Sequence, residues 1–138
     1  MGSVRSYLYY LFNNFKAILF HRITADEVRL IKSTGFFAEM PALQLQKLLR
    51  SVRARYFEDG QIIFKEGTIG NGLYIIDKGV VLVFTYNKQG KKIPLACLER
   101  GAYFGEQALL GQVNKSRNAS IEAIGKTKLL KIKPRFIR

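Results

Sequence analysis

The residues whose types and spacing best suit chemistry lie in the stretch 104–123, FGEQALLGQVNKSRNASIEA. Gly105 opens an apolar run, residues 106–110, that suits a short helix. A glycine at the start of a helix lets a ligand approach the backbone, and the unpaired amides there favour an anion. After a loop, Arg117 supplies a planar, permanently charged guanidinium that suits phosphate. The spacing therefore predicts an anion-binding loop.

Glu106 indicates which anion this loop would bind. A carboxylate repels phosphate, so Glu106 is explained if the ligand also carries a hydroxyl donor at the distance of a sugar. A phosphate together with a ribose hydroxyl indicates a nucleotide. A second interpretation stays open, in which Glu106 complements a helix dipole and Arg117 faces solvent.

The same stretch resembles the phosphate-binding cassette of cyclic-nucleotide-binding domains. The family pattern is Phe-Gly-Glu, any residue, Ala-Leu, a variable loop, and then Arg-x-Ala-(Ser/Thr)-(Val/Ile)-x-Ala. The residues that match it in order are Phe104, Gly105, Glu106, Ala108, Leu109, Arg117, Ala119, Ser120, Ile121 and Ala123. The loop 111–116 is longer than in the protein-kinase members, which bears on the placement of Arg117.

The resemblance implies a cyclic AMP or cyclic GMP ligand and no metal. Backbone amides after Phe104 would face the cyclic phosphate and ribose. Arg117 would pair with the phosphate, and Glu106 would accept from the ribose 2′-hydroxyl. Apolar contact to sugar and base would come from Val83 and Phe104. The residues expected to bind the ligand are Val83, Phe104, Gly105, Glu106, Gln107, Ala108, Arg117, Asn118 and Ala119.

The residue after the arginine often separates the two ligands in this family. Threonine there tends to accompany cyclic GMP, and alanine cyclic AMP. This chain has Asn118, which is neither. An amide could recognise a guanine edge or face solvent, so Asn118 leaves the choice of nucleotide open.

The rest of the composition argues against an enzyme. The chain has a single cysteine, Cys97, and a single histidine, His21, among 138 residues. These exclude a disulfide framework, a cysteine-based zinc site and a Ser-His-Asp or Cys-His arrangement. We therefore expect no catalytic residues and no metal, and a reducing, cytoplasmic compartment.

The net charge of +13 favours the approach of any anion. The basic residues are scattered, and the alternation of Lys126 with Lys128, and of Lys131 with Lys133, is typical of the solvent face of a strand. A nucleic-acid surface would also need exposed aromatic residues or a reading helix. Neither is evident, so we expect no nucleic-acid partner.

The N-terminal segment 6–20, SYLYYLFNNFKAILF, is predicted to be a helix that packs on the domain or on a partner. Its apolar run is far shorter than the ~20 residues of a membrane span. Gly2 and Ser6 fit an N-myristoylation pattern, and the residues before Val4 also fit an expression-vector remnant. Association with a membrane therefore stays open as an alternative.

Two further helices are predicted before the strands begin. One covers residues 24–33, where Thr24 and Glu27 have capping-box spacing and Gly35 would end the helix. Pro41 opens the next, and its expected buried stripe consists of Leu43, Leu45, Leu48, Leu49 and Val52. We expect an N-terminal helical segment, residues 1–34, and a cyclic-nucleotide-binding domain, residues 35–138.

From Tyr56 the sequence becomes rich in β-branched residues separated by glycines. Strands are predicted at 62–64, 73–76, 80–86, 91–98 and 129–132, and the run 118–123 also alternates like a strand. Residues 87–90 form a predicted hairpin turn, and Pro94 should lie at an edge or a bulge. The predicted class is α+β: a mainly-β jelly-roll barrel with N-terminal helices and a short cassette helix.

The sequence ends in PRFIR, residues 134–138, where the family's lid helices would begin, so we expect a truncated or absent lid and a fragment of a larger regulator. The leading hypothesis is a sensor of cyclic AMP or cyclic GMP that relays a conformational change to an attached effector such as a protein kinase. Two alternatives stay open: the nucleotide-binding domain of an ion channel, and a basic, membrane-associated adaptor with a vestigial pocket.

Overall fold

The computed structural model describes residues 23–35, 37–68, 72–105 and 118–133, together with Leu8 and Leu11. Within them lie the helices α2 (Ala25–Ser33) and α3 (Ala42–Ser51). The strands are β1 (Arg53–Phe57), β2 (Ile62–Phe64), β3 (Leu73–Tyr86), β4 (Lys92–Leu98), β5 (Tyr103–Phe104) and β6 (Ser120–Ile132). Nearly all of the predicted helix 6–20, and the cassette helix after Gly105, lie outside the described residues.

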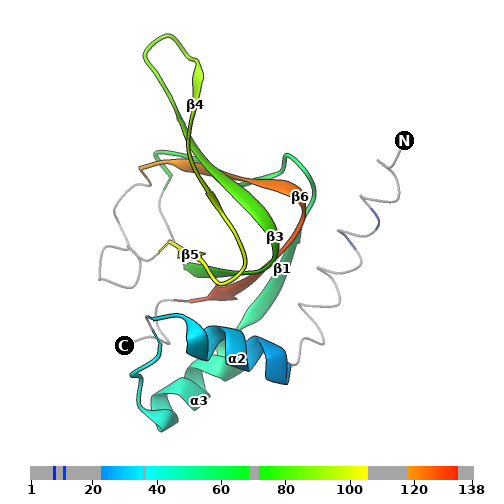
Figure 1. Ribbon diagram of the computed structural model, residues 1–138, viewed down its shortest axis with the longest axis vertical. Helices are drawn as coiled ribbons and strands as arrows, with labels where there is room; N and C mark the ends of the chain where they lie inside the picture. Colours follow the sequence, from blue (N-terminus) through cyan, green and yellow to red (C-terminus); the bar gives the residue numbers. More distant parts are fainter. Residues whose placement is uncertain are drawn as a thin grey trace.

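The described strands form one antiparallel sheet with β6 and β3 at its centre. Its order is β1-β6-β3-β4, while β2 pairs with β6 and β5 pairs with β3. The sheet is strongly curved, helices α2 and α3 lie together at one end, and the β3–β4 hairpin projects at the other (Figure 1). The prediction of a mainly-β α+β fold with N-terminal helices is confirmed, although the described sheet does not close.

The two central strands are longer than predicted. The expected strands at 73–76 and 80–86 are one strand, β3, whose pairing with β6 shifts register on both sides of Lys78. Gly79 has a φ of +89° at this irregularity. The expected strand at 129–132 is likewise the end of β6, which begins at Ser120. Strands β1 and β5 were not predicted.

The hairpin between β3 and β4 follows the prediction. The amide of Asn87 donates to the carbonyl of Lys91 at 2.9 Å, and Gly90 has a φ of +78°. Pro94 lies on the edge strand β4 opposite Phe84, where the register with β3 shifts. A proline is tolerated there because its missing amide removes no central ladder bond.

The helices confirm the start signals and correct two details. The amide of Glu27 donates to Thr24 Oγ1 at 3.1 Å, and Glu27 Oε1 accepts from the amide of Thr24 at 2.9 Å, which is the predicted capping box. Gly35 does not end α2 in a left-handed turn, because Thr34 forms the C-cap in extended backbone. Leu43 is 75% exposed, so it does not belong to the buried stripe of α3.

Each face of the sheet buries its own apolar cluster. One face packs against the helices, where Leu30 and Ile31 of α2 and Leu48 of α3 contact residues of β3 and β6. The opposite, concave face holds a second cluster, which we call the inner cluster. It consists of Tyr74, Ile76, Val81, Phe104, Ile121 and Leu129, with Val83, Phe64 and other partly buried residues against them. The inner cluster is where the predicted ligand wall lies.

Candidate functional site

Phe104 and Val83, the two residues expected to contact sugar and base, belong to the same inner cluster. Phe104 is 5% exposed and stacks on Tyr74, with ring centroids 5.2 Å apart. Val83 is half-buried on β3, where it pairs with Ile121 of β6. Phe104 and Val83 are therefore linked through one apolar surface, although they lie on different strands.

The described ends of the predicted binding segment flank this surface. Gly105 directly follows Phe104, is buried, and has a φ of +87°, a conformation that favours glycine. At the other end, Asn118 is exposed and Ala119 is half-buried, immediately before β6. The other expected ligand residues, Glu106, Gln107, Ala108 and Arg117, lie outside the described residues.

A hydrogen-bonded link near the start of β6 was missed by sequence reasoning. The buried Ser120 accepts a hydrogen bond through Oγ from the amide of Glu66, at 2.8 Å. The Glu66 carboxylate in turn accepts from Thr85 Oγ1, at 2.7 Å. This link fixes the β2–β3 loop against the residues that follow Asn118. In the sequence, the match of Ser120 to the cassette pattern was the only signal for this hydrogen-bonded link.

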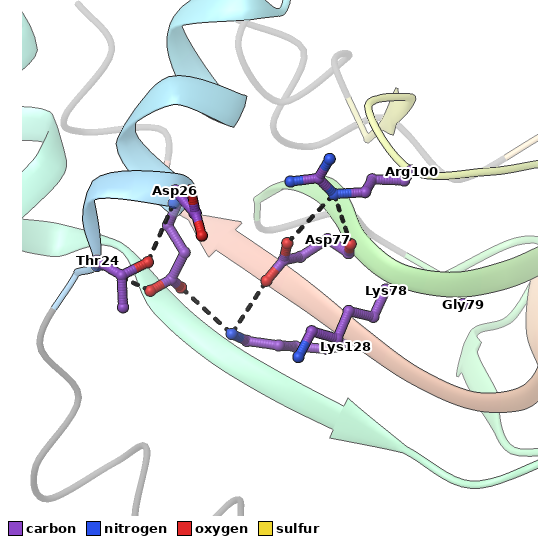
Figure 2. Close-up of a pocket in the computed structure, with 8 residues that line it drawn as sticks. Thr24, Asp26, Asp77, Lys78, Gly79, Arg100 and Lys128 are labelled. Atoms are coloured by element: carbon purple, nitrogen blue, oxygen red, sulfur yellow. Dashed lines mark hydrogen bonds and ion pairs between the residues drawn. The ribbon is translucent and has the colours of Figure 1, made fainter.

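A second polar feature lies on the helix side of the sheet, where α2 meets β3 and β6. Figure 2 shows Asp77 between two cations, Lys128 and Arg100. Lys128 Nζ lies 3.0 Å from Asp77 Oδ2 and 3.6 Å from Glu27 Oε2. Arg100 Nε donates to the Asp77 carbonyl at 3.1 Å. We call Glu27, Asp77, Arg100 and Lys128 together the ionic junction. They border a cavity of about 650 Å³ that is lined by Thr24, Asp26, Glu27, Asp77, Lys78, Gly79, Arg100 and Lys128.

The position of Lys128 corrects the prediction of a solvent face for this part of β6. Its side chain is 14% exposed, whereas Lys126 and Lys133 are exposed as expected. Burial lowers the pKa of Lys128, but the hydrogen bond to Asp77 and the charges of Asp77 and Glu27 raise it more. The net effect is a pKa above the ordinary 10.5. Lys128 therefore carries its charge in an environment of two carboxylates.

This raised pKa predicts a loss of stability at alkaline pH. A group with a raised folded pKa stabilises fully below its unfolded pKa, and the stabilisation is lost as pH rises through the folded value. We therefore expect the free energy of unfolding to fall above about pH 10.5 partly through Lys128. Urea unfolding between about pH 9 and 11.5 measures it.

The matched control for the pH experiment is Lys78, which is exposed and pairs with Lys128 in register. Lys128→Met should flatten the alkaline loss, and Lys78→Met should keep it. The difference between the two curves isolates the contribution that depends on Lys128. An alkaline loss of equal size in both variants would contradict the role given to Lys128.

Comparison with known proteins decides the family. The family model described as "Cyclic nucleotide-binding domain" matches residues 54–138. The chain belongs to this family. It is 36% identical over 103 residues to a cAMP-dependent protein kinase regulatory subunit from Mucor circinelloides f. lusitanicus, covering 75% of the chain and 22% of that relative. It is also 35% identical over 99 residues to a cGMP-dependent protein kinase from Eimeria tenella, covering 72% of the chain and 9% of that relative.

The solved structures agree with the sequence relatives. The regulatory domain of Toxoplasma gondii PKA with cAMP superposes with a TM-score of 0.69 at 26% identity, covering 78% of this chain and 41% of that one. The predicted jelly-roll class of this cyclic nucleotide-binding domain is thereby confirmed. The domain spans less than a quarter of the length of the two kinase relatives named above.

Among the described residues, no group of three or more His, Cys, Asp or Glu side chains could hold a metal ion. Over the same residues, no helix is both long enough and apolar enough to cross a membrane.

Proposed function

We propose that this domain binds cyclic AMP or cyclic GMP between the inner cluster and the segment 105–119, and relays the binding event to an attached effector of the protein-kinase type. The observation that carries the proposal is the backbone at Gly105. This glycine is buried at a positive φ directly after Phe104, at the edge of the apolar surface that also holds Val83. Backbone amides that start there would face a phosphate without a side chain in between.

The roles within the site follow from charge and polarity. Arg117 would pair with the cyclic phosphate, and Glu106 would accept a hydrogen bond from the ribose 2′-hydroxyl. Amides of Gly105, Gln107 and Ala108 would complete the phosphate contacts, with Asn118 and Ala119 closing the far side of the segment. Val83 and Phe104 would give apolar contact. The relatives' names include both cAMP-dependent and cGMP-dependent kinases, so both nucleotides are candidates.

The names of the relatives favour a sensor role over an enzyme role. The kinase relatives include regulatory subunits. A ligand shifts such a domain only by its differential affinity for two conformations. The effector would therefore be attached to or associated with the elements that differ between these two conformations.

Replacing Arg117 by alanine is expected to weaken nucleotide binding at least about tenfold, which corresponds to ~1.4 kcal/mol. The loss follows because hydrogen bonds to charged groups contribute roughly 1.5–3 kcal/mol each. Titration calorimetry with cyclic AMP and cyclic GMP, side by side, measures the dissociation constants of both nucleotides.

Arg50→Ala is the matched control, because Arg50 is an exposed arginine in the last turn of α3. It should bind as the wild type does. An Arg117→Ala protein with wild-type affinity would refute the assignment of Arg117. A folded wild-type protein that gives heat with neither nucleotide would refute nucleotide sensing itself.

A further inference from the structure

The β3–β4 hairpin carries charge of one sign. Residues 78–98 contain four lysines and no acidic residue. Three of these lysines, Lys88, Lys91 and Lys92, lie at or beside the turn that joins the two strands. The hairpin projects from the body of the molecule at the end opposite α2 and α3 (Figure 1). Among the described residues, Lys88 and Lys91 form no ion pair, so their charges are open to an anionic partner.

Apolar side chains are exposed beside these lysines. Tyr86 is 53% exposed at the end of β3, and Leu95 is 55% exposed on the edge strand β4. Pro94, next to Leu95, is exposed as well. This combination matches the boundary between lipid headgroups and acyl chains, because that layer accepts an aromatic ring, apolar atoms and cations together.

The tip of the hairpin is held in one conformation by its own contacts. Asn87 Oδ1 accepts hydrogen bonds from the amides of Gln89 and Lys91, each at 2.9 Å. The ring of Tyr86 packs edge-on against the buried Phe84, with centroids 5.5 Å apart and an interplanar angle of 90°. A rigid tip loses little conformational freedom when it binds, so its contacts contribute more fully to affinity.

Lys92 differs from the other two lysines of the hairpin. Its Nζ forms an ion pair with Glu122 of β6 and lies 4.3 Å from the centre of the Phe84 ring. Lys92 therefore fastens the base of the hairpin to the sheet. The cations that remain for a partner are Lys88 and Lys91.

We propose that the β3–β4 hairpin binds a bilayer surface that contains anionic lipids. Lys88 and Lys91 contact the lipid headgroups. Tyr86 and Leu95 reach the apolar layer directly beneath, and this contact needs no nucleotide. A nucleic acid would require several exposed aromatic rings for stacking, and within residues 78–98 Tyr86 is the one exposed ring, because Phe84 is buried.

Sedimentation of the full chain with lipid vesicles tests the charged contact. The wild type should bind vesicles of phosphatidylcholine mixed with phosphatidylserine, and should not bind pure phosphatidylcholine. The double substitution Lys88→Glu with Lys91→Glu should weaken this binding at least about tenfold. Added salt should weaken wild-type binding, because it screens the attraction. A folded wild type that binds neither kind of vesicle would overturn the proposal, including the case in which it binds single-stranded RNA instead.

The double substitution Lys32→Glu with Lys47→Glu is the matched control. Lys32 and Lys47 are exposed on α2 and α3, at the other end of the molecule (Figure 1). The two double variants have the same net charge, so a difference between them reports the position of the contact. The control should bind nearly as the wild type does. Equal losses in both variants would indicate overall charge, and no loss in the hairpin variant would indicate another segment, such as 6–20; either result would overturn the proposal.

A fluorescence measurement tests the apolar contact. The chain has no tryptophan, so Tyr86→Trp places a single reporter on the hairpin. Its emission should shift to the blue on vesicles with phosphatidylserine, because the indole leaves water. Leu43→Trp is the control, since Leu43 is 75% exposed on α3 and its reporter should stay unshifted. An unshifted emission from Tyr86→Trp, or equal shifts at both positions, would overturn the proposal.

Discussion

Replacing Gly79 by alanine is expected to lower the free energy of unfolding by about 2 to 5 kcal/mol. Two effects add. The φ of +89° costs an L side chain roughly 1–2 kcal/mol, as in a left-handed helix. In addition, a Cβ at this position would lie 2.6 Å from the carbonyl oxygen of Lys126 and 2.7 Å from Thr127 Oγ1. Backbone of β6 would have to move, at a further ~1–3 kcal/mol.

Gly90 offers a control that separates the two effects. Its φ is +78°, close to that of Gly79, but a Cβ there would meet nothing within 4 Å. Gly90→Ala should therefore cost only the backbone strain. Urea unfolding of both variants measures the difference, and equal losses would show that the contact with β6 is absent in solution.

The consequence of Gly79 for function lies in the register of β3. The pairing with β6 shifts on both sides of Lys78, directly beside Asp77. Thr127, which lies within the irregularity on β6, is buried and precedes Lys128. The close approach at Gly79 thus sets how Asp77 and Lys128 face each other. We expect Gly79→Ala to disturb the ionic junction as well as the stability.

Local signals in the sequence predicted much of this fold, because their physical causes are local. The capping box of Thr24 and Glu27 depends on a spacing of three residues, and the hairpin after Tyr86 depends on its turn residues. Pro94 was predicted at an edge or bulge because it lacks an amide hydrogen, and it lies at both. The motif around Gly105 likewise indicated the family that the comparisons confirm.

Features that depend on strand register could not be predicted in the same way. Lys128 has the same spacing pattern as its exposed neighbours, and only the pairing of β6 with β3 places it between Asp77 and Glu27. Asp77 and Lys128 lie on opposite sides of a long connection, so no local pattern links them. Strand β1 was missed because Arg53 and Arg55 interrupt its apolar residues.

In the candidate site, too, the sequence predicted some features and missed others. Phe104 and Val83 were expected to contact one ligand because of the family pattern, and the structure places both against the inner cluster. The stacking of Phe104 on Tyr74 was not foreseen, because Tyr74 carried no motif beyond a strand pattern. The Arg117 and Phe104 substitutions test whether a nucleotide binds between the inner cluster and this proposed binding segment.

Phe104→Ala is expected to lower the free energy of unfolding by about 3–5 kcal/mol, the usual loss for a buried phenylalanine. Phe104 is 5% exposed and contacts two rings, with centroids 5.2 Å from Tyr74 and 5.6 Å from Phe64. Removing the ring leaves a cavity under Gly105, where the proposed binding segment begins. Thermal and urea unfolding measure the loss, and a change below about 1 kcal/mol would contradict this packing.

Phe104→Leu separates the structural role of Phe104 from its proposed contact with the ligand. Leucine keeps most of the apolar volume, so the stability loss should stay within about 1.5 kcal/mol. A base or sugar that packs against the aromatic face would still lose that contact. We therefore expect Phe104→Leu to remain folded and to bind cyclic nucleotide several-fold more weakly in calorimetry. Wild-type affinity in a folded Phe104→Leu protein would confine Phe104 to the core, and the ligand's apolar wall would then begin at Val83.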